Sequence, residues 1–346
     1  MASKKLNNVY VQHFDKELKI EEKFTVGNEE EKYVYRIIYQ DITYILKGFR
    51  IQLEQLNPDN KETAESFKES LVQISEVFQE FHFSRAACLL NPHIAKPLFL
   101  DFTVDLPEDK ISCCYMHFQI IFEYAGTALN ELKPTGVELT YNLMRQSANA
   151  LFLLHNLGIV HFDIKPANMV YDERKDLLKI IDMGSAFGRS NQKPLDTTVN
   201  LGEKVRSFTR EFAPPEILLM ENSVVNNTNL PLSLASIDVY SWAMSFFALI
   251  TNRGYGDLKI YCDNYKRGSK SDYKKFKEVV KISFDSVKAE NDKEKDLKNI
   301  IRTLLNKALR YKPKKRSNFE KLISMMKKIS TRYSIPRKSV NMIKNY

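Results

Sequence analysis

The hydrophobic pattern of this 346-residue chain changes along its length, from strand-like in the first third to helical beyond about residue 137. Four runs rich in β-branched and aromatic residues predict strands: 33–39, 42–49, 97–104 and 115–124. Gln40-Asp41 suits a tight hairpin between the first two runs, and the polar segment DLPEDK suits one between the last two. A sheet-rich part followed by a helical part predicts an α+β fold with two lobes.

Two long helices are indicated by apolar residues that recur every three or four positions. The first covers 62–90, where Asn91-Pro92 breaks the pattern. Its apolar positions are Phe67, Leu71, Ile74, Phe78 and Phe81. The second begins near residue 137 and ends at Gly158.

Composition and length restrict the class of protein. Hydrophobic residues make up 43% and charged residues 27%, which excludes a largely disordered chain. The length suggests two packed lobes, and no run of 18 apolar residues predicts a membrane span. The N-terminus is too charged for a signal peptide. The four cysteines show no metal-binding spacing, so we expect reduced thiols in a cytoplasmic or nuclear, non-secreted protein: Cys88, Cys113, Cys114 and Cys262.

The net charge of +9 is unevenly distributed. Residues 251–346 hold 27 Lys and Arg against 10 Asp and Glu, whereas residues 1–250 hold 25 against 33. A lysine-rich run would steer an acidic protein substrate: Lys266, Arg267, Lys270, Lys274, Lys275 and Lys277. Residues 311–346 carry 11 basic residues and one acidic residue, a surface for nucleic acid, microtubules or an anionic membrane. The simpler interpretation is a solvated lysine-rich surface.

Two short segments have the residues that phosphoryl transfer requires. His161-Phe162-Asp163-Ile164-Lys165-Pro166-Ala167-Asn168 follows the second helix, and Asp182-Met183-Gly184 begins 14 residues after Asn168. The reaction needs a carboxylate to accept the proton of the incoming hydroxyl and oxygen ligands for Mg²⁺. Asp163 fits the first role, and Asn168 and Asp182 fit the second. Lys165 would hold the transferring phosphate.

These segments resemble the eukaryotic protein kinase family, and the order of further motifs strengthens the resemblance. Ile164-Lys165-Pro166 is similar to the serine/threonine branch. Phe212-Ala213-Pro214-Pro215-Glu216 resembles the end of the activation segment, and Thr209 then matches the threonine that contacts the catalytic aspartate and lysine. Asp238 resembles the aspartate of a buried helix that holds the catalytic loop. Arg316 resembles the arginine that pairs with the activation-segment glutamate, here Glu216.

The first lobe carries further parts of the resemblance. Tyr44-Ile45-Leu46-Lys47 is similar to the third-strand motif whose lysine holds the α and β phosphates of ATP. Its helix partner would be Glu80, or Glu76 one turn earlier, and we favour Glu80 because Phe83 and Ala87 follow it on the predicted sheet-facing side. Asn91-Pro92-His93-Ile94 resembles the entry to the fourth strand. In Phe122-Glu123-Tyr124-Ala125, backbone groups of Glu123 and Ala125 would meet adenine.

The resemblance implies a bilobal protein-kinase-like fold, a β-rich N-lobe and a helical C-lobe, with ATP and Mg²⁺ as cofactors. It covers roughly residues 20–330 and predicts an N-terminal extension, an N-lobe, a C-lobe and a basic tail: 1–19, 20–125, 126–330 and 331–346. We expect a cleft between the lobes to gather Lys47, Asp163, Asn168 and Asp182 around a metal–nucleotide.

The sequence departs from the family pattern at the loop that covers the phosphates. The family's glycine-rich motif would begin at Gly27 and end at Val34, but Glu29 and Lys32 replace its second and third glycines. Glycines there let backbone N–H groups approach phosphate, and the carboxylates of Glu29–Glu31 would repel it.

Two further departures lie in the second half. Phe162 replaces the arginine that grips a phosphorylated activation segment, so we expect activity without phosphorylation of Thr197, Thr198 or Ser207. Met183 replaces a phenylalanine, and its side chain fills a similar apolar space.

Three functions are compatible with these residues. The first is an ATP-dependent serine/threonine protein kinase. The second is a pseudokinase that acts as a scaffold or allosteric partner because the acidic loop prevents productive ATP binding. The third is a small-molecule kinase, against which Lys165-Pro166, Thr209 and Pro214-Pro215-Glu216 argue, because they resemble parts that bind a polypeptide.

Overall fold

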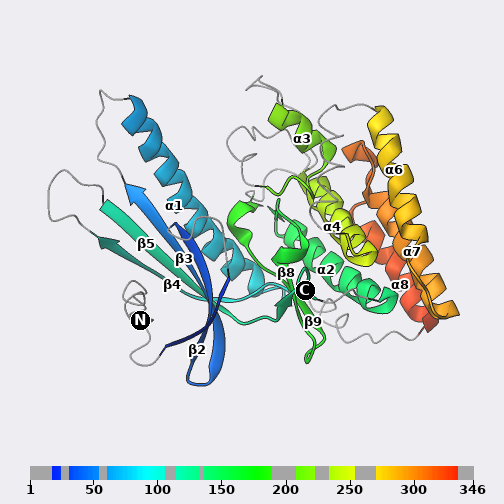
Figure 1. Ribbon diagram of the computed structural model, residues 1–346, viewed down its shortest axis with the longest axis horizontal. Helices are drawn as coiled ribbons and strands as arrows, with labels where there is room; N and C mark the ends of the chain where they lie inside the picture. Colours follow the sequence, from blue (N-terminus) through cyan, green and yellow to red (C-terminus); the bar gives the residue numbers. More distant parts are fainter. Residues whose placement is uncertain are drawn as a thin grey trace. The chain divides into compact units, whose positions relative to one another are not determined.

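The computed structural model describes residues 18–24, 31–53, 61–105, 114–132, 136–188, 208–222, 234–253 and 270–333. The chain divides into two compact units (Figure 1). The first contains residues up to Leu89 together with Ala95–Ala125, and the second contains Leu90–Ile94 and everything from Gly126 onward. The first unit is rich in β-strands and the second is mainly helical, so the predicted α+β class is confirmed.

A five-stranded sheet forms the first unit, in the order β1-β2-β3-β5-β4, with every neighbouring pair antiparallel. The strands are β1 (Lys19–Phe24), β2 (Lys32–Tyr39), β3 (Ile42–Leu53), β4 (Pro97–Asp105) and β5 (Cys114–Glu123). Gln40 and Asp41 form the predicted hairpin turn, with φ of 48° and 60°. Two consecutive positive φ angles are what a two-residue type I′ turn requires.

The sheet packs around a small apolar cluster of Ile37, Leu46 and Ile121, each at most 2% exposed. On β3, Gly48 is opposite Tyr33 of β2. A Cβ atom at Gly48 would lie 2.0 Å from the Tyr33 ring, so any side chain at this position would displace that ring. The Tyr33 hydroxyl accepts a hydrogen bond from Gln119 Nε2 at 3.0 Å, and burial raises the pKa of that phenol.

Helix α1 (Lys61–Cys88) packs against β3 and β4 through a face that is only partly apolar. The positions with at most 6% exposure are Ser70, Val77, Glu80, Ser84 and Ala87. The apolar residues Leu71 and Phe78, which the periodicity placed on one stripe, are 49% and 37% exposed. The predicted helix is present, and its buried face includes the carboxylate of Glu80 rather than the whole apolar stripe.

The second unit is built from helices and two small sheets. The helices are α2 (Val137–Asn156), α3 (Pro215–Asn222), α4 (Leu234–Thr251), α6 (Lys270–Asp285), α7 (Asp292–Ala308) and α8 (Phe319–Tyr333). One sheet contains β6 (Thr127–Ala128), β8 (Met169–Asp172) and β9 (Leu177–Ile180), and the other pairs β7 (Ile159–Val160) with β10 (Phe187–Gly188). Helix α2 ends as the sequence indicates, because Gly158 has a φ of 73° suited to a helix C-terminus.

Helix α4 forms the centre of the second unit. It has the length and mean hydropathy, 1.4 over 18 residues, of a membrane-crossing helix, although the sequence analysis found no such run. However, 83% of that window is buried inside the protein, which is typical of a core helix. Trp242 of α4 donates from Nε1 to Ser147 Oγ on α2 at 2.9 Å.

Residues 90–94 were assigned to the first lobe but belong to the second unit. Asn91 Nδ2 donates to the Ala150 carbonyl at 2.9 Å, and the Ile180 N–H donates to the His93 carbonyl at 2.7 Å. The His93 ring lies 2.7 Å from the Leu178 carbonyl, and burial lowers the pKa of its imidazole. These contacts hold the segment against α2 and β9.

Candidate active site

The loop between β7 and β8, residues 161–168, is held from below by one buried carboxylate. Asp238 of α4 is 0% exposed and accepts the backbone N–H of His161 at 2.8 Å and of Phe162 at 2.9 Å. Its Oδ2 atom also lies 2.9 Å from His155 Nε2 at the end of α2. A buried carboxylate with three partners is a strong anchor, and Asp238 takes the position that the resemblance implied.

The anchored backbone adopts an unusual conformation at Phe162, whose φ is 71°. A left-handed conformation is unfavourable for a residue with a bulky side chain, and the two hydrogen bonds to Asp238 hold it in place. The His161 ring bridges to the next segment, because its Nε2 lies 3.0 Å from the Ile181 carbonyl. The loop is therefore fixed on both sides of Asp163.

The carboxylate of Asp163 is surrounded by hydrogen-bond donors from the predicted set. Lys165 Nζ lies 2.7 Å from Oδ2, and the Thr209 N–H donates to Oδ1 at 2.9 Å. Lys165 also donates to Thr209 Oγ1 at 2.8 Å. The three residues named as catalytic thus form one connected cluster, in which Thr209 joins the aspartate to the lysine.

Asn168 and Asp182 supply oxygen atoms of the kind that Mg²⁺ prefers. Asn168 uses its Nδ2 group to donate to Asp163, at 2.8 Å to the carbonyl and 3.2 Å to Oδ2. The amide oxygen of Asn168 therefore points to other partners. Asp182 follows Ile181, whose N–H donates to the Asn168 carbonyl at 3.0 Å, and it has a left-handed φ of 64°. This donor set fits a hard divalent cation.

Met183, which follows Asp182, stands where the family has a phenylalanine. Met183 is 0% exposed, so its side chain fills an apolar space as the sequence analysis expected.

In the first unit, Lys47 of β3 and Glu80 of α1 form a buried ion pair. Lys47 Nζ lies 2.7 Å from both carboxylate oxygens, and the two residues are 8% and 2% exposed. Glu76, the alternative partner, is exposed on the same helix. Val34, which the resemblance places at the end of the phosphate-covering motif, is directly opposite Lys47 in the β2–β3 pairing.

In the segment 122–125, which is predicted to contact adenine, the backbone N–H of Glu123 already donates a hydrogen bond within the protein. The Glu123 N–H donates to the Lys96 carbonyl at 3.0 Å, and the Lys96 N–H donates to Glu123 Oε1 at 2.8 Å. Of the Glu123 backbone groups, only the carbonyl oxygen could therefore serve adenine. Ala125, which is 9% exposed, stays a predicted contact.

The end of the activation segment is fixed by a second ion pair. Arg316, which precedes α8, binds both carboxylate oxygens of Glu216, with Nη2 to Oε2 at 2.6 Å. The guanidinium also donates to the carbonyls of Arg310 and Ser236 at 2.8 and 3.2 Å. This is the pair that the resemblance implied.

Several predicted residues lie outside the part of the chain that the structure describes. They are Gly27, Glu29, Glu30, Thr197, Thr198, Ser207, Lys266 and Arg267. Lys47 belongs to the first unit and Asp163, Asn168 and Asp182 to the second, so their meeting around one nucleotide stays a prediction.

One residue of the site was missed by the sequence analysis. His155 lies six positions before His161 on an amphipathic helix, where a histidine gives no signal of its own. Only the fold shows that its ring contacts Asp238.

Residues 103–326 match the family model for the protein kinase domain. The chain is similar to GLH-binding kinase 1 of Caenorhabditis elegans, with 27% identity over 47% of this chain and 37% of that protein. It is also similar to serine/threonine-protein kinase MPS1 of Saccharomyces cerevisiae, with 36% identity over 32% of this chain and 14% of that protein.

A third relative is the chloroplastic serine/threonine-protein kinase STN7 of Arabidopsis thaliana, with 30% identity over 32% of this chain and 19% of that protein. The chain thus spans well under half the length of these curated relatives.

Proposed function

This chain belongs to the protein kinase domain family, and from that premise we propose that it transfers the γ-phosphate of ATP to serine or threonine hydroxyls of proteins. The observation that carries the proposal is the cluster of Asp163, Lys165 and Thr209, in which one carboxylate is held by a lysine and a backbone N–H. The serine/threonine kinases among its relatives support the choice of hydroxyl.

In the proposed reaction, Asp163 orients the substrate hydroxyl and accepts its proton. The hydroxyl oxygen forms a bond to the γ-phosphorus while the bond to the leaving ADP oxygen breaks. Lys165 provides positive charge next to Asp163, where the transferring phosphoryl group carries negative charge. Thr209 keeps the carboxylate and the ammonium in register through its backbone N–H and its hydroxyl.

The remaining residues bind the nucleotide in this proposal. Asn168 and Asp182 would hold Mg²⁺, which neutralises charge on the phosphates. Lys47, oriented by Glu80, would hold the α and β phosphates. The buried ion pair fits that role because it presents an ammonium group already fixed by two carboxylate contacts.

The direct test is transfer of radiolabelled γ-phosphate to generic acidic and basic protein substrates such as casein and myelin basic protein. We expect labelled phosphoserine or phosphothreonine with the wild-type protein. Asp163→Asn should lower the rate about 10²- to 10⁴-fold, the usual contribution of a general base. Equal rates for the two proteins would contradict the proposed role of Asp163, and unlabelled substrate with wild type would contradict the proposed activity.

The second candidate function is a pseudokinase, and a specific observation favours it. Lys32, which replaces a glycine of the phosphate-covering motif, is the first residue of β2, and its ammonium lies 5.4 Å from the centre of the Phe49 ring. Together with Glu29–Glu31 it gives this loop a chemistry unlike a phosphate cradle.

Thermal unfolding with and without ATP and Mg²⁺ separates the two functions. A protein that binds the nucleotide gains about 2.7 kcal/mol at a ligand concentration 100 times Kd. We expect a rise in Tm for the wild type and none for Asp182→Ala. No rise with millimolar nucleotide would favour the scaffold function.

A further inference from the structure

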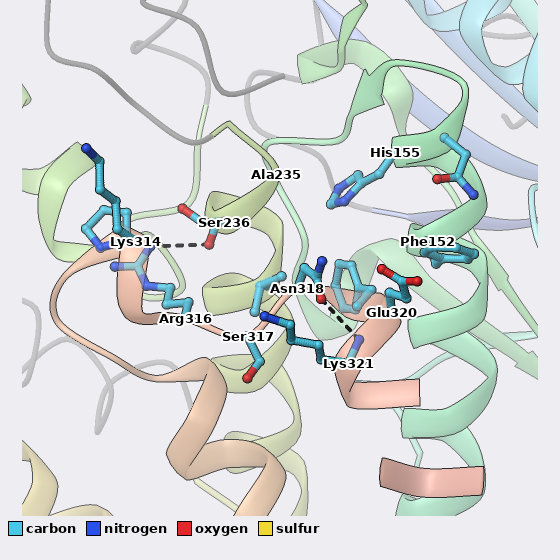
Figure 2. Close-up of a pocket in the computed structure, with 14 residues that line it drawn as sticks. Phe152, His155, Ala235, Ser236, Lys314, Arg316, Ser317, Asn318, Glu320 and Lys321 are labelled. Carbon is cyan, nitrogen blue, oxygen red and sulfur yellow. Dashed lines mark hydrogen bonds between the residues drawn. The ribbon is translucent and has the colours of Figure 1, made fainter. Parts of the chain in front are cut away.

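A surface pocket of about 690 Å³ lies in the second unit, where the end of α2 meets the start of α4 and the turn before α8. Figure 2 shows Phe152 and His155 on the α2 side, Ala235 and Ser236 on α4, and Lys314 and Arg316 on the turn. None of the residues assigned to ATP, Mg²⁺ or proton transfer lines it. A pocket of this size is large enough for one or two side chains of a bound partner.

The inner wall of the pocket is apolar. Phe319 and Val239 are each 1% exposed, and Phe152 is half-buried beside them. The Phe319 ring is packed edge-on against Trp242 of the core, with ring centres 5.6 Å apart. Phe319 and Val239 have almost no surface left to cover, so a large apolar side chain placed here would gain free energy of burial mainly against the Phe152 ring.

The rim of the pocket is basic. Lys314 and Lys321 are exposed at its edge, and neither side chain has a hydrogen-bond or ion-pair partner among the residues that the structure describes. Residues 312–321 contain five basic residues against one acidic residue, Glu320. Arg316 is already neutralised by Glu216, so the exposed lysines set the charge that a partner would meet.

One hydrogen-bonded contact and one ion pair fix two walls of the pocket. His155 is held by Asp238 and Arg316 by Glu216, and both partners are buried or nearly so. A preformed pocket binds with a smaller loss of conformational entropy than one that must be ordered.

We propose that this pocket docks an acidic segment of a partner protein that carries one large apolar side chain. The apolar side chain would contact Phe152, and flanking carboxylates would pair with Lys314 and Lys321. In the described part of the chain, the wall has no broadly exposed aromatic ring on which a base could stack, because Phe319 is buried and Phe152 is half-buried, which favours a peptide over a nucleic acid. The inference does not depend on catalysis, because docking needs neither ATP nor Asp163.

The test is fluorescence anisotropy without nucleotide, using a labelled peptide in which a central phenylalanine is flanked on each side by three glutamates. Two peptide controls replace the phenylalanine by alanine or all glutamates by glutamine. The protein variant is Lys314→Glu/Lys321→Glu. Its matched control, called the α6 variant, is Lys281→Glu/Lys288→Glu, which changes the net charge equally at exposed positions in and just after α6, away from the pocket.

We expect the wild type to bind the phenylalanine peptide, and the pocket variant to bind it at least about tenfold more weakly, as charge reversal at an interface rim allows. Both control peptides should bind more weakly than the parent, and the α6 variant should bind as the wild type does. All four lysines are exposed, so each variant should keep the wild-type Tm.

Three results would overturn the proposal. One is no binding of the parent peptide by the wild type. Another is equal weakening in both double variants, which would mean diffuse attraction by a basic surface. The third is binding of a short thymidine oligonucleotide that is as tight as peptide binding and is lost in the same variant, which would mean that the site recognises charge alone.

Discussion

The two units differ in how closely their residues follow the family pattern for binding ATP and transferring phosphate. In the second unit, the loop around Asp163 has the aspartate, lysine and asparagine of the family pattern but a phenylalanine, Phe162, in place of the arginine. Asp238 fixes its backbone through hydrogen bonds to His161 and Phe162. In the first unit, the Lys47–Glu80 pair is intact, but the phosphate-covering loop has lost two of its three glycines. The residues proposed for proton and phosphoryl transfer are therefore present in the second unit, whereas the proposed phosphate-covering loop of the first unit departs from the family pattern.

The largest expected effect on stability is at the Lys47–Glu80 pair. Lys47→Met leaves the buried Glu80 carboxylate without this partner, which should lower the free energy of unfolding by about 3–5 kcal/mol. Lys47→Met/Glu80→Leu should recover most of that loss, because two apolar side chains replace the pair, yet it should not recover phosphate transfer. Chemical denaturation and the transfer assay measure the two quantities. If the double variant regained activity, the pair would be structural only.

A smaller loss is expected at the anchor of the catalytic loop. Asp238→Asn keeps the side-chain size but turns one acceptor oxygen into a donor, so one buried backbone N–H loses its partner. The expected loss is about 1–3 kcal/mol of unfolding free energy, with reduced transfer at saturating ATP. The matched control is Asp285→Asn, which breaks the exposed ion pair with Arg302 and should change stability by less than about 1 kcal/mol. Similar losses in both would contradict the anchoring role.

Restoring a glycine of the phosphate-covering loop tests whether the altered loop weakens the affinity for ATP. Glu29→Gly should lower KM for ATP by up to about tenfold, because a carboxylate near phosphate costs about 1 kcal/mol even in water. Glu29→Gln separates the charge from the backbone freedom that glycine adds. Neither variant should alter kcat, since Asp163, Lys165 and Asn168 are unchanged. An unchanged KM in both would show that Glu29 points away from the nucleotide.

The smallest effect concerns pH. Burial lowers the pKa of His93 from 6.5, with further lowering by Lys179 and Arg145 and an opposing hydrogen bond to Leu178. The unfolded chain therefore binds a proton before the folded one, so stability is full above pH 6.5 and decreases as the pH falls below it. Urea titrations at pH 7.5 and 5.5 measure the free energy of unfolding at each pH, and the difference between the two values should be smaller for His93→Gln than for the wild type. If His93→Gln leaves that difference unchanged, other groups cause the pH dependence.

The candidate catalytic segment, residues 161–168, could be recognised from the sequence because its functional residues are close together in the chain. Asp163, Lys165 and Asn168 lie within six residues, so their identity and spacing indicate the reaction before any fold is known. Thr209 and Glu216 are distant in sequence, and only the resemblance to a family connected them to Asp163 and Arg316.

Other features depended on tertiary structure. Strand β1 was not predicted, because KIEEKF contains only two apolar residues and its pairing with β2 defines it. The preference for Glu80 over Glu76 came from the residues that follow it, and the structure pairs Lys47 with Glu80. Residues 90–94 join the second unit through hydrogen bonds to Ala150 and Leu178, which no local pattern encodes.

We propose that this chain performs the chemical step and that its altered phosphate-covering loop weakens its affinity for ATP. Steady-state measurement of kcat and KM for ATP, for the wild type and for Asp163→Asn, examines both parts of this proposal. We expect turnover by the wild type with an elevated KM, and loss of kcat without change in ATP affinity for Asp163→Asn. Absence of turnover by the wild type at an ATP concentration that saturates its Tm shift would contradict it.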